Sequence, residues 1–266
     1  MSVRANELAS RRPPQPSLRA SLHPAESAAS NMMYEPISLD MLIETPEEVI
    51  ENFRAYLSTI PFLYNNYAVS VLGRQLKTEG DVHMFFDSSI LLPVWPVALA
   101  MVPTVRVADL VLASEKTYNG VHPSRPDTSI IAYNGTASSS TTMAKIKYKG
   151  PRGLAGFRNV IRAYFEERVI QVPESWNIVT RQLRKYAKEA KCRSVLCSDG
   201  SDAYIFLFPA DESSEEVQFL MASDDASNDG TSLTLREAVL YLICLGIEHN
   251  SPFTLRYVYC SFLELR

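Results

Sequence analysis

Cysteine, histidine and glycine are scarce in this sequence. The four cysteines, Cys192, Cys197, Cys244 and Cys260, lie in apolar surroundings and show no CxxC spacing. This pattern excludes a disulfide framework or a cysteine-rich zinc site and indicates buried free thiols, as in an intracellular protein. The four histidines are scattered, which disfavours a histidine-rich metal site. Ten glycines without a fixed repeat period disfavour a repeat architecture.

Long hydrophobic runs and the motifs of several large enzyme classes are missing too. There is no P-loop, no GxGxxG after a strand, no GxSxG elbow and no HExxH. The most apolar run, "SILLPVWPVALAMVP" at residues 89–103, is short and contains Pro93 and Pro96. We therefore expect it to be an interrupted core segment and not a membrane span.

Charge is unevenly distributed along the chain. The formal net charge is only −4. Residues 145–193, however, hold thirteen lysines and arginines against four acids, a net charge of +9, whereas residues 199–248 hold eleven acids and one base, a net charge of −10. The local field of the middle segment favours an anionic partner.

Composition divides the chain into an N-terminal segment and one domain. Residues 1–35 are rich in Ser, Ala, Pro and Arg without periodicity, which predicts disorder; a transit peptide is the alternative. Residues 36–266 are expected to form a single domain with a core at about 75–210 and a C-terminal extension at 211–266. The chain stops within a strand-like pattern, which is compatible with a longer parent protein.

Periodicity and end signals predict a mixed α/β fold. Asn134-Gly135 and Asp199-Gly200 are tight-turn signals between strands. The expected strands are 104–114, 126–135, 141–150, two short ones around Asp199-Gly200, 215–223 and 253–265. The expected helices are 45–60 (capped by Thr45 with Glu48), one from Thr78, 154–169, 175–191 (capped by Ser175) and 234–248 (Thr234 with Glu237).

The strand "TTMAKIKYKG" carries lysines at every second position. Alternate side chains of a strand point to opposite faces, so three ammonium groups would line one face and apolar groups the other. A solvated sheet face is the plain interpretation, and an anion-binding site is the other. The lysines are Lys145, Lys147 and Lys149, and the apolar residues between them are Ala144, Ile146 and Tyr148.

The order of elements and three short motifs resemble a known family. Pro126-Asp127 opens the second strand, "AKIK" ends in Lys147 on the third, and the following helix carries Gln182 and Tyr186 four positions apart. This combination resembles the PD-(D/E)XK nuclease superfamily, in particular its RecB-like branch with a QxxxY helix. The resemblance covers about residues 75–210 and implies a restriction-endonuclease-like αβββαβ core with helical N-terminal and α/β C-terminal additions.

The resemblance implies roles for five residues. Asp127 would be a ligand of Mg²⁺ or Mn²⁺, helped by Glu79 early in the preceding helix. Lys147 would be the catalytic lysine, and Gln182 and Tyr186 would orient the phosphate or the lysine. Plain interpretations stand beside these roles: a turn residue for Asp127, a solvated strand lysine for Lys147 and a core position for Tyr186.

One position departs from the pattern. The second acid of the family, two residues before the catalytic lysine, falls on Lys145. Two like charges 4 Å apart cost about 4 kcal/mol at an effective dielectric constant of 20, so a divalent ion should bind poorly here. The sequence thus favours a nuclease-like protein with a degenerate metal site.

The expected partner is nucleic acid, with DNA favoured over RNA, and no membrane. An active metal-dependent nuclease using Asp127 and Lys147 is one alternative. The other is a protein-interaction domain whose acidic C-terminal third covers its basic segment. The residues expected to contact nucleic acid are Lys145, Lys149, Arg152, Arg181 and Lys185.

Overall fold

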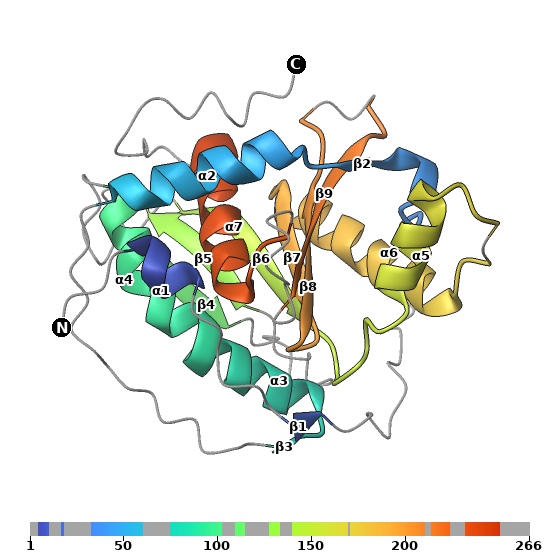
Figure 1. Ribbon diagram of the computed structural model, residues 1–266, viewed down its shortest axis with the longest axis horizontal. Coiled ribbons are helices and arrows are strands. Elements are labelled where there is room, and N and C mark those ends of the chain that lie inside the picture. Colours follow the sequence, from blue (N-terminus) through green and yellow to red (C-terminus); the bar gives the residue numbers. More distant parts are fainter. Residues whose placement is uncertain are drawn as a thin grey trace.

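A seven-stranded mixed sheet forms the centre of the protein (Figure 1). The computed structural model describes residues 5–10, 17–18, 33–60, 75–102, 110–114, 128–133, 140–169, 171–210, 214–223 and 232–250. In spatial order the strands are β2 (Leu42–Glu44), β9 (Val217–Ser223), β8 (Asp202–Leu207), β7 (Ser194–Ser198), β6 (Ser140–Tyr148), β5 (Thr128–Tyr133) and β4 (Leu110–Ser114).

The strand directions confirm the expected mixed α/β class. β4, β5 and β6 are antiparallel neighbours, β6 and β7 are parallel, and β7, β8 and β9 are again antiparallel. The short β2 runs parallel to β9 at one edge. The antiparallel pairing of strands 126–135 and 141–150 is therefore confirmed, whereas Asn134-Gly135 lies outside the described residues.

Helices cover both faces of the sheet (Figure 1). Two separate apolar cores result, one on each face. One face carries α1 (Ala5–Ser10), α2 (Glu47–Thr59), α3 (Glu79–Phe86), α4 (Leu92–Met101) and α7 (Leu235–Asn250), and the other carries α5 (Phe157–Phe165) and α6 (Glu174–Glu189). The remaining elements are a 3₁₀ turn, η2 (Leu39–Met41), and a parallel two-residue pair, β1 (Ser17–Leu18) with β3 (Gln75–Leu76).

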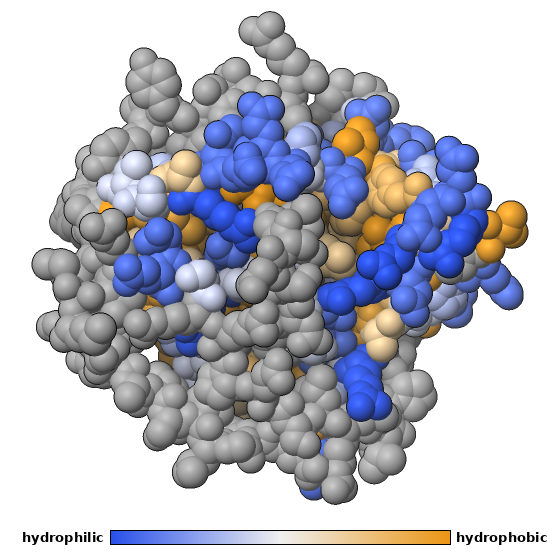
Figure 2. Space-filling view, in the orientation of Figure 1, coloured by the Kyte–Doolittle hydropathy of each residue, from blue (hydrophilic) through white to orange (hydrophobic). Residues whose placement is uncertain are grey.

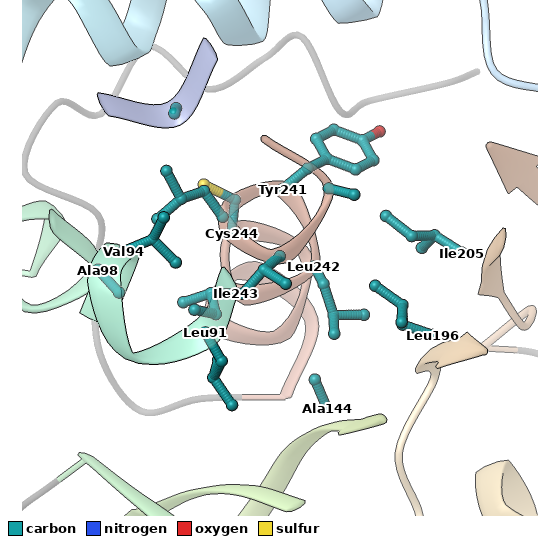
Figure 3. Close-up of a cluster of buried hydrophobic side chains, with 14 of the residues drawn as sticks. Leu91, Val94, Ala98, Ala144, Leu196, Ile205, Tyr241, Leu242, Ile243 and Cys244 are labelled. Carbon is teal, nitrogen blue, oxygen red and sulfur yellow. The ribbon is translucent and has the colours of Figure 1, made fainter. Parts of the chain in front are cut away.

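The buried helix α7 packs between α4 and the sheet (Figure 3). Its side chains meet residues of α4 and of strands β6, β7 and β8 in one apolar cluster. At Gly246 the helix comes very close to the strand: an added Cβ would lie 2.9 Å from the carbonyl oxygen of Met143 on β6. The pairing of β5 with β6 skips Met143, which marks a β-bulge at this contact. Only glycine permits so close an approach.

Residues 79–101 form one continuous helix, contrary to the interruption expected at Pro93. A π-helical turn, η3 (Asp87–Leu91), joins α3 to α4, and Pro93 lies just after it. Proline cannot donate to the carbonyl four residues earlier, which is that of Ser89. That carbonyl instead accepts two hydrogen bonds from the Arg236 guanidinium, at 2.9 and 3.2 Å. An external donor thus satisfies the acceptor that the proline leaves, and the helix continues.

The expectation that the apolar segment is too short to span a membrane is wrong by length alone. The 23 residues of this helix, Glu79–Met101, are long and apolar enough to span a membrane by length and composition, which the sequence analysis did not foresee. However, 56% of its most apolar window is buried inside the protein, as in the core helix of a soluble protein.

Two of the expected helix caps are confirmed and two are wrong. Thr78 caps α3 in a capping box with Asp81, and Thr234 exchanges hydrogen bonds with Glu237 at the start of α7. Thr45 instead donates its hydroxyl to the carbonyl of Phe219, because β2 pairs with β9 and holds it there. Pro46 precedes α2, and Pro173, not Ser175, precedes α6.

The predicted disorder of residues 1–35 is wrong for residues 5–10. The helix α1 buries Ala5, Leu8 and Ala9 in the core beside α2, α4 and α7. The hydroxyl of Thr234 donates to the carbonyl of Ala9, which fastens the end of α1 to the start of α7. The strand expected at 253–265 lies outside the described residues.

Candidate functional site

The two lysines of β6 and Lys149, which directly follows the strand, are buried. Their exposed fractions are 8% for Lys145, 3% for Lys147 and 2% for Lys149, so a solvated sheet face is the wrong interpretation. The parallel register places Lys145 beside Val195 and Lys147 beside Cys197, whose side chains belong to the core under α5 and α6. We call Lys145, Lys147 and Lys149 the lysine row.

Each lysine of the row has a specific neighbour. The ammonium nitrogen of Lys147 lies 3.2 Å from a carboxylate oxygen of Glu79, the first residue of α3. Lys149 donates a hydrogen bond to the side-chain carbonyl of Gln182 on α6. The ammonium of Lys145 lies 5.4 Å from the ring centroid of Tyr186, and that of Lys147 lies 6.0 Å from it, both within range of cation–π attraction.

The structure thus brings together most of the residues that the sequence analysis selected. Glu79, Lys147, Gln182 and Tyr186 come from three elements far apart in the chain and meet around the row. Asp127 lies outside the described residues, immediately before Thr128, the first residue of β5.

The site lies where β6 and β7 end. These strands are parallel, and their connection through α5 and α6 forms a β-α-β crossover. Ligands of open α/β sheets bind beyond the carboxyl ends of such strands. The pairing continues past β6, since the Lys149 amide donates to the carbonyl of Ser198 at 2.9 Å. Lys149, the last residue of the row, therefore lies at the carboxyl ends of β6 and β7, where ligands of such sheets usually bind.

A buried aspartate organises the loops at this edge. Asp199, fully buried, accepts hydrogen bonds from the amides of Ser201 and Asp202, which confirms the expected hairpin turn after β7. Its other oxygen accepts from the Leu154 amide at 3.1 Å, in the loop that follows β6. The same loop contains Arg152, which is exposed and adopts a positive φ of 62°. Asp199 thus ties the two strand-end loops together.

Cations of α6 flank the lysine row. Arg181 and Lys185, both half-buried, each precede by one position a residue that contacts the row, Gln182 and Tyr186 respectively. Residues four apart lie on one side of a helix, so the two cations form a stripe next to the two contact residues. Figure 2 shows hydrophilic side chains gathered over α5 and α6 on the outer surface. The buried row therefore adjoins a half-buried cationic stripe.

The described part of the chain shows no cluster of metal-ligating side chains at the lysine row. Within the described ranges no group of three or more histidine, cysteine, aspartate or glutamate side chains could hold one. Glu79 supplies a carboxylate, but that carboxylate contacts the ammonium of Lys147. Mg²⁺ and Mn²⁺ require several oxygen ligands, and a neighbouring ammonium repels them. The ammonium groups of the row are themselves suited to holding an anion.

Burial is the main influence on the pKa values of the two thiols next to the lysine row. It raises the pKa of Cys197 to about 12, although the charges of Lys149 and Lys147 act in the opposite direction. Burial likewise raises the pKa of Cys192 to about 12 against the effect of Lys145. Both remain neutral thiols at physiological pH, so neither balances the positive charge of the row.

A polar cluster on the opposite face of β6 was missed in the sequence analysis. The Tyr148 hydroxyl donates to Asp87 at 2.9 Å, and the His83 ring nitrogen lies 3.0 Å from the other oxygen of Asp87 and 3.2 Å from the Thr128 hydroxyl. These contacts fix α3, and with it Glu79, against β5 and β6. The i,i+4 spacing of His83 and Asp87 was a visible signal.

Comparisons of the chain with protein-family models, with curated proteins and with solved structures found no match.

Proposed function

We propose that this protein is a nucleic-acid-binding module with a nuclease-like arrangement of residues and without a working metal site. The observation that carries the proposal is the burial of Lys145, Lys147 and Lys149 together at the ends of the parallel strands β6 and β7. Burying an ammonium group is costly unless it is paired or hydrogen-bonded. The row concentrates three such groups, and an anion bound beside them would complement that charge, as the Glu79 carboxylate does for Lys147.

Phosphodiester groups match this chemistry. Ammonium groups bind phosphate oxygens as point charges and donate hydrogen bonds without reading base sequence. The exposed Arg152 and the half-buried Arg181 and Lys185 would extend the contact beyond the buried row. We therefore expect binding with little base specificity and a strong dependence on salt concentration.

The order of elements supports the nuclease-like part of the proposal. The continuous helix α3–α4, the meander β4–β5–β6, the helices α5 and α6 and the parallel strand β7 follow one another, which is an αβββαβ order with α5 as an additional helix. In this arrangement Lys147 takes the place of the catalytic lysine, and Lys145 takes the place of an acidic metal ligand. The ammonium group of Lys145 would supply the positive charge that a nuclease obtains from its metal ion.

Binding of a fluorescent oligonucleotide across a salt series tests the proposal. On duplex DNA the slope of log affinity against log salt is about −0.9 for each phosphate that is neutralised. A double variant, Arg152→Ala with Lys185→Ala, should flatten the slope by about 2. Arg162→Gln, an exposed arginine of α5, is the matched control and should change it little. An absence of binding at low salt would refute the proposal and favour the protein-interaction alternative.

An active nuclease is the second candidate, because the carboxylate of Glu79 lies at hydrogen-bond distance from the ammonium of Lys147. A cleavage assay with Mg²⁺ and Mn²⁺ on single-stranded and duplex substrates separates the two. Cleavage by the wild type that Asp127→Ala abolishes would establish the nuclease. We expect binding without cleavage.

A further inference from the structure

We infer that the lysine row receives a single strand of nucleic acid and discriminates against duplex. The inference rests on the proposed function and narrows its substrate class. It is carried by three features of the described residues: the depth of the row, its linear spacing and the aromatic ring beside it.

The depth of the row disfavours a duplex. Lys149 is 2% exposed and donates a hydrogen bond to Gln182, and Lys147 is 3% exposed and contacts Glu79. A duplex is stiff and carries its phosphates on the outside, so it meets cations that project from a protein surface. A single strand is thin and flexible, and one of its phosphates can replace the Glu79 carboxylate or the Gln182 carbonyl as the partner of an ammonium group.

The spacing of the row fits an extended backbone. Lysines two positions apart on a strand are separated by about 7 Å along its axis. Lys145, Lys147 and Lys149 thus leave the backbone at regular steps along β6 and its continuation. Proteins that bind single strands combine such a cationic track with aromatic side chains on which bases stack.

Tyr186 supplies the aromatic element. Its ring lies within 6.0 Å of the ammonium groups of both Lys145 and Lys147, and the residue is half-buried. A base can stack on a tyrosine only when it is unpaired, and such stacking raises the affinity by about fivefold to about 150-fold per base. The combination of Tyr186 with the row therefore selects unpaired nucleotides.

The experiment compares two forms of one sequence. Fluorescence anisotropy is recorded at low salt with EDTA, using a labelled 15-nucleotide strand and the blunt duplex formed with its complement. We expect the single strand to bind at least tenfold more tightly. Equal or tighter binding of the duplex would overturn the inference while leaving the proposed function intact. Binding of neither form would overturn both.

A variant identifies the residue responsible. Tyr186→Leu should weaken binding of the single strand at least fivefold and leave duplex binding nearly unchanged, whereas Tyr186→Phe should keep the preference because the ring remains. Tyr164→Leu, a half-buried tyrosine on the neighbouring α5, is the matched control. Circular dichroism establishes that each variant folds. If Tyr186→Leu and Tyr186→Phe both lose the preference, or both keep it, stacking on the ring is not its source.

Discussion

The Glu79 carboxylate lies 3.2 Å from the ammonium of Lys147, although 68 positions separate the two residues in the chain. The side chains are only 12% and 4% exposed, so the pair is poorly screened by water. A carboxylate in this position resembles a phosphate oxygen in charge and in hydrogen-bonding capacity. Glu79 therefore competes with any anion that approaches the lysine row.

This competition predicts that Glu79→Gln binds nucleic acid more tightly than the wild type. The change removes a negative charge that repels the incoming phosphate, and we expect about a tenfold gain, equivalent to about 1.4 kcal/mol. Anisotropy titrations in EDTA measure it. Glu51→Gln, an exposed acid on α2, controls for net charge. A loss of affinity in Glu79→Gln would instead mark Glu79 as a required contact.

The second prediction concerns the charge at position 145. Lys145→Glu replaces a repulsive ammonium with oxygen ligands two positions before Lys147, the residue that Glu79 contacts, so Mn²⁺ affinity should rise at least tenfold in calorimetric titrations. Lys145→Gln, which removes the charge without adding a carboxylate, should show a smaller gain. Combination with Asp127→Ala should remove the gain of Lys145→Glu. Equal Mn²⁺ affinity in the wild type and Lys145→Glu would argue against a nuclease-like origin of the site.

A stability prediction follows from Asp199. Its carboxylate accepts hydrogen bonds from the Leu154, Ser201 and Asp202 amides, and also from the Ser201 hydroxyl. Asp199→Ala leaves several buried donors without an acceptor, and each costs about 1–3 kcal/mol, so urea denaturation should show a loss of about 3 kcal/mol or more. Ser201→Ala removes a single side-chain bond and should cost about 1 kcal/mol. Similar losses in both would mean that the loops are not tied through Asp199.

We expect His249, at the end of α7, to make the folded protein less stable in acid. Burial, and secondarily the charge of Arg193, lowers the pKa of His249 to about 4 from an ordinary value of 6.5. Between these values the unfolded chain binds a proton that the folded protein does not, so stability should fall as pH falls from 6.5 to 4. Denaturation midpoints across this range should decline less steeply in His249→Gln. An identical decline would assign the acid sensitivity to other groups.

Much of the fold could be predicted because its signals are local. Alternation identified β5 and β6 and their antiparallel pairing, and the Asp199-Gly200 turn signal identified the β7–β8 hairpin. The interruption expected at Pro93 is wrong for a non-local reason: Arg236, 143 positions away, donates to the carbonyl that the proline leaves without its usual donor, and the helix continues. α1 was missed similarly, since its short apolar stretch is helical only against α2, α4 and α7.

The composition of the site was easier to predict than its environment. The sequence pointed to Glu79, Lys147, Gln182 and Tyr186, and all four meet around the row. It did not indicate that the lysines would be buried, because alternation gives the face of a side chain but not what covers that face. The cluster of His83, Asp87, Tyr148 and Thr128 joins α3, η3, β6 and β5, and the sequence signals only its His83–Asp87 part through the i,i+4 spacing.

The close approach of Gly246 to the backbone of Met143 has a consequence for genetics. α7 packs against one face of β6, and the lysine row lies on the other face. A larger side chain at position 246 would displace the backbone of β6 and, with it, the lysines. Such a variant would weaken ligand binding without contacting the ligand, and a mutational screen scored by binding alone would wrongly assign position 246 to the binding site.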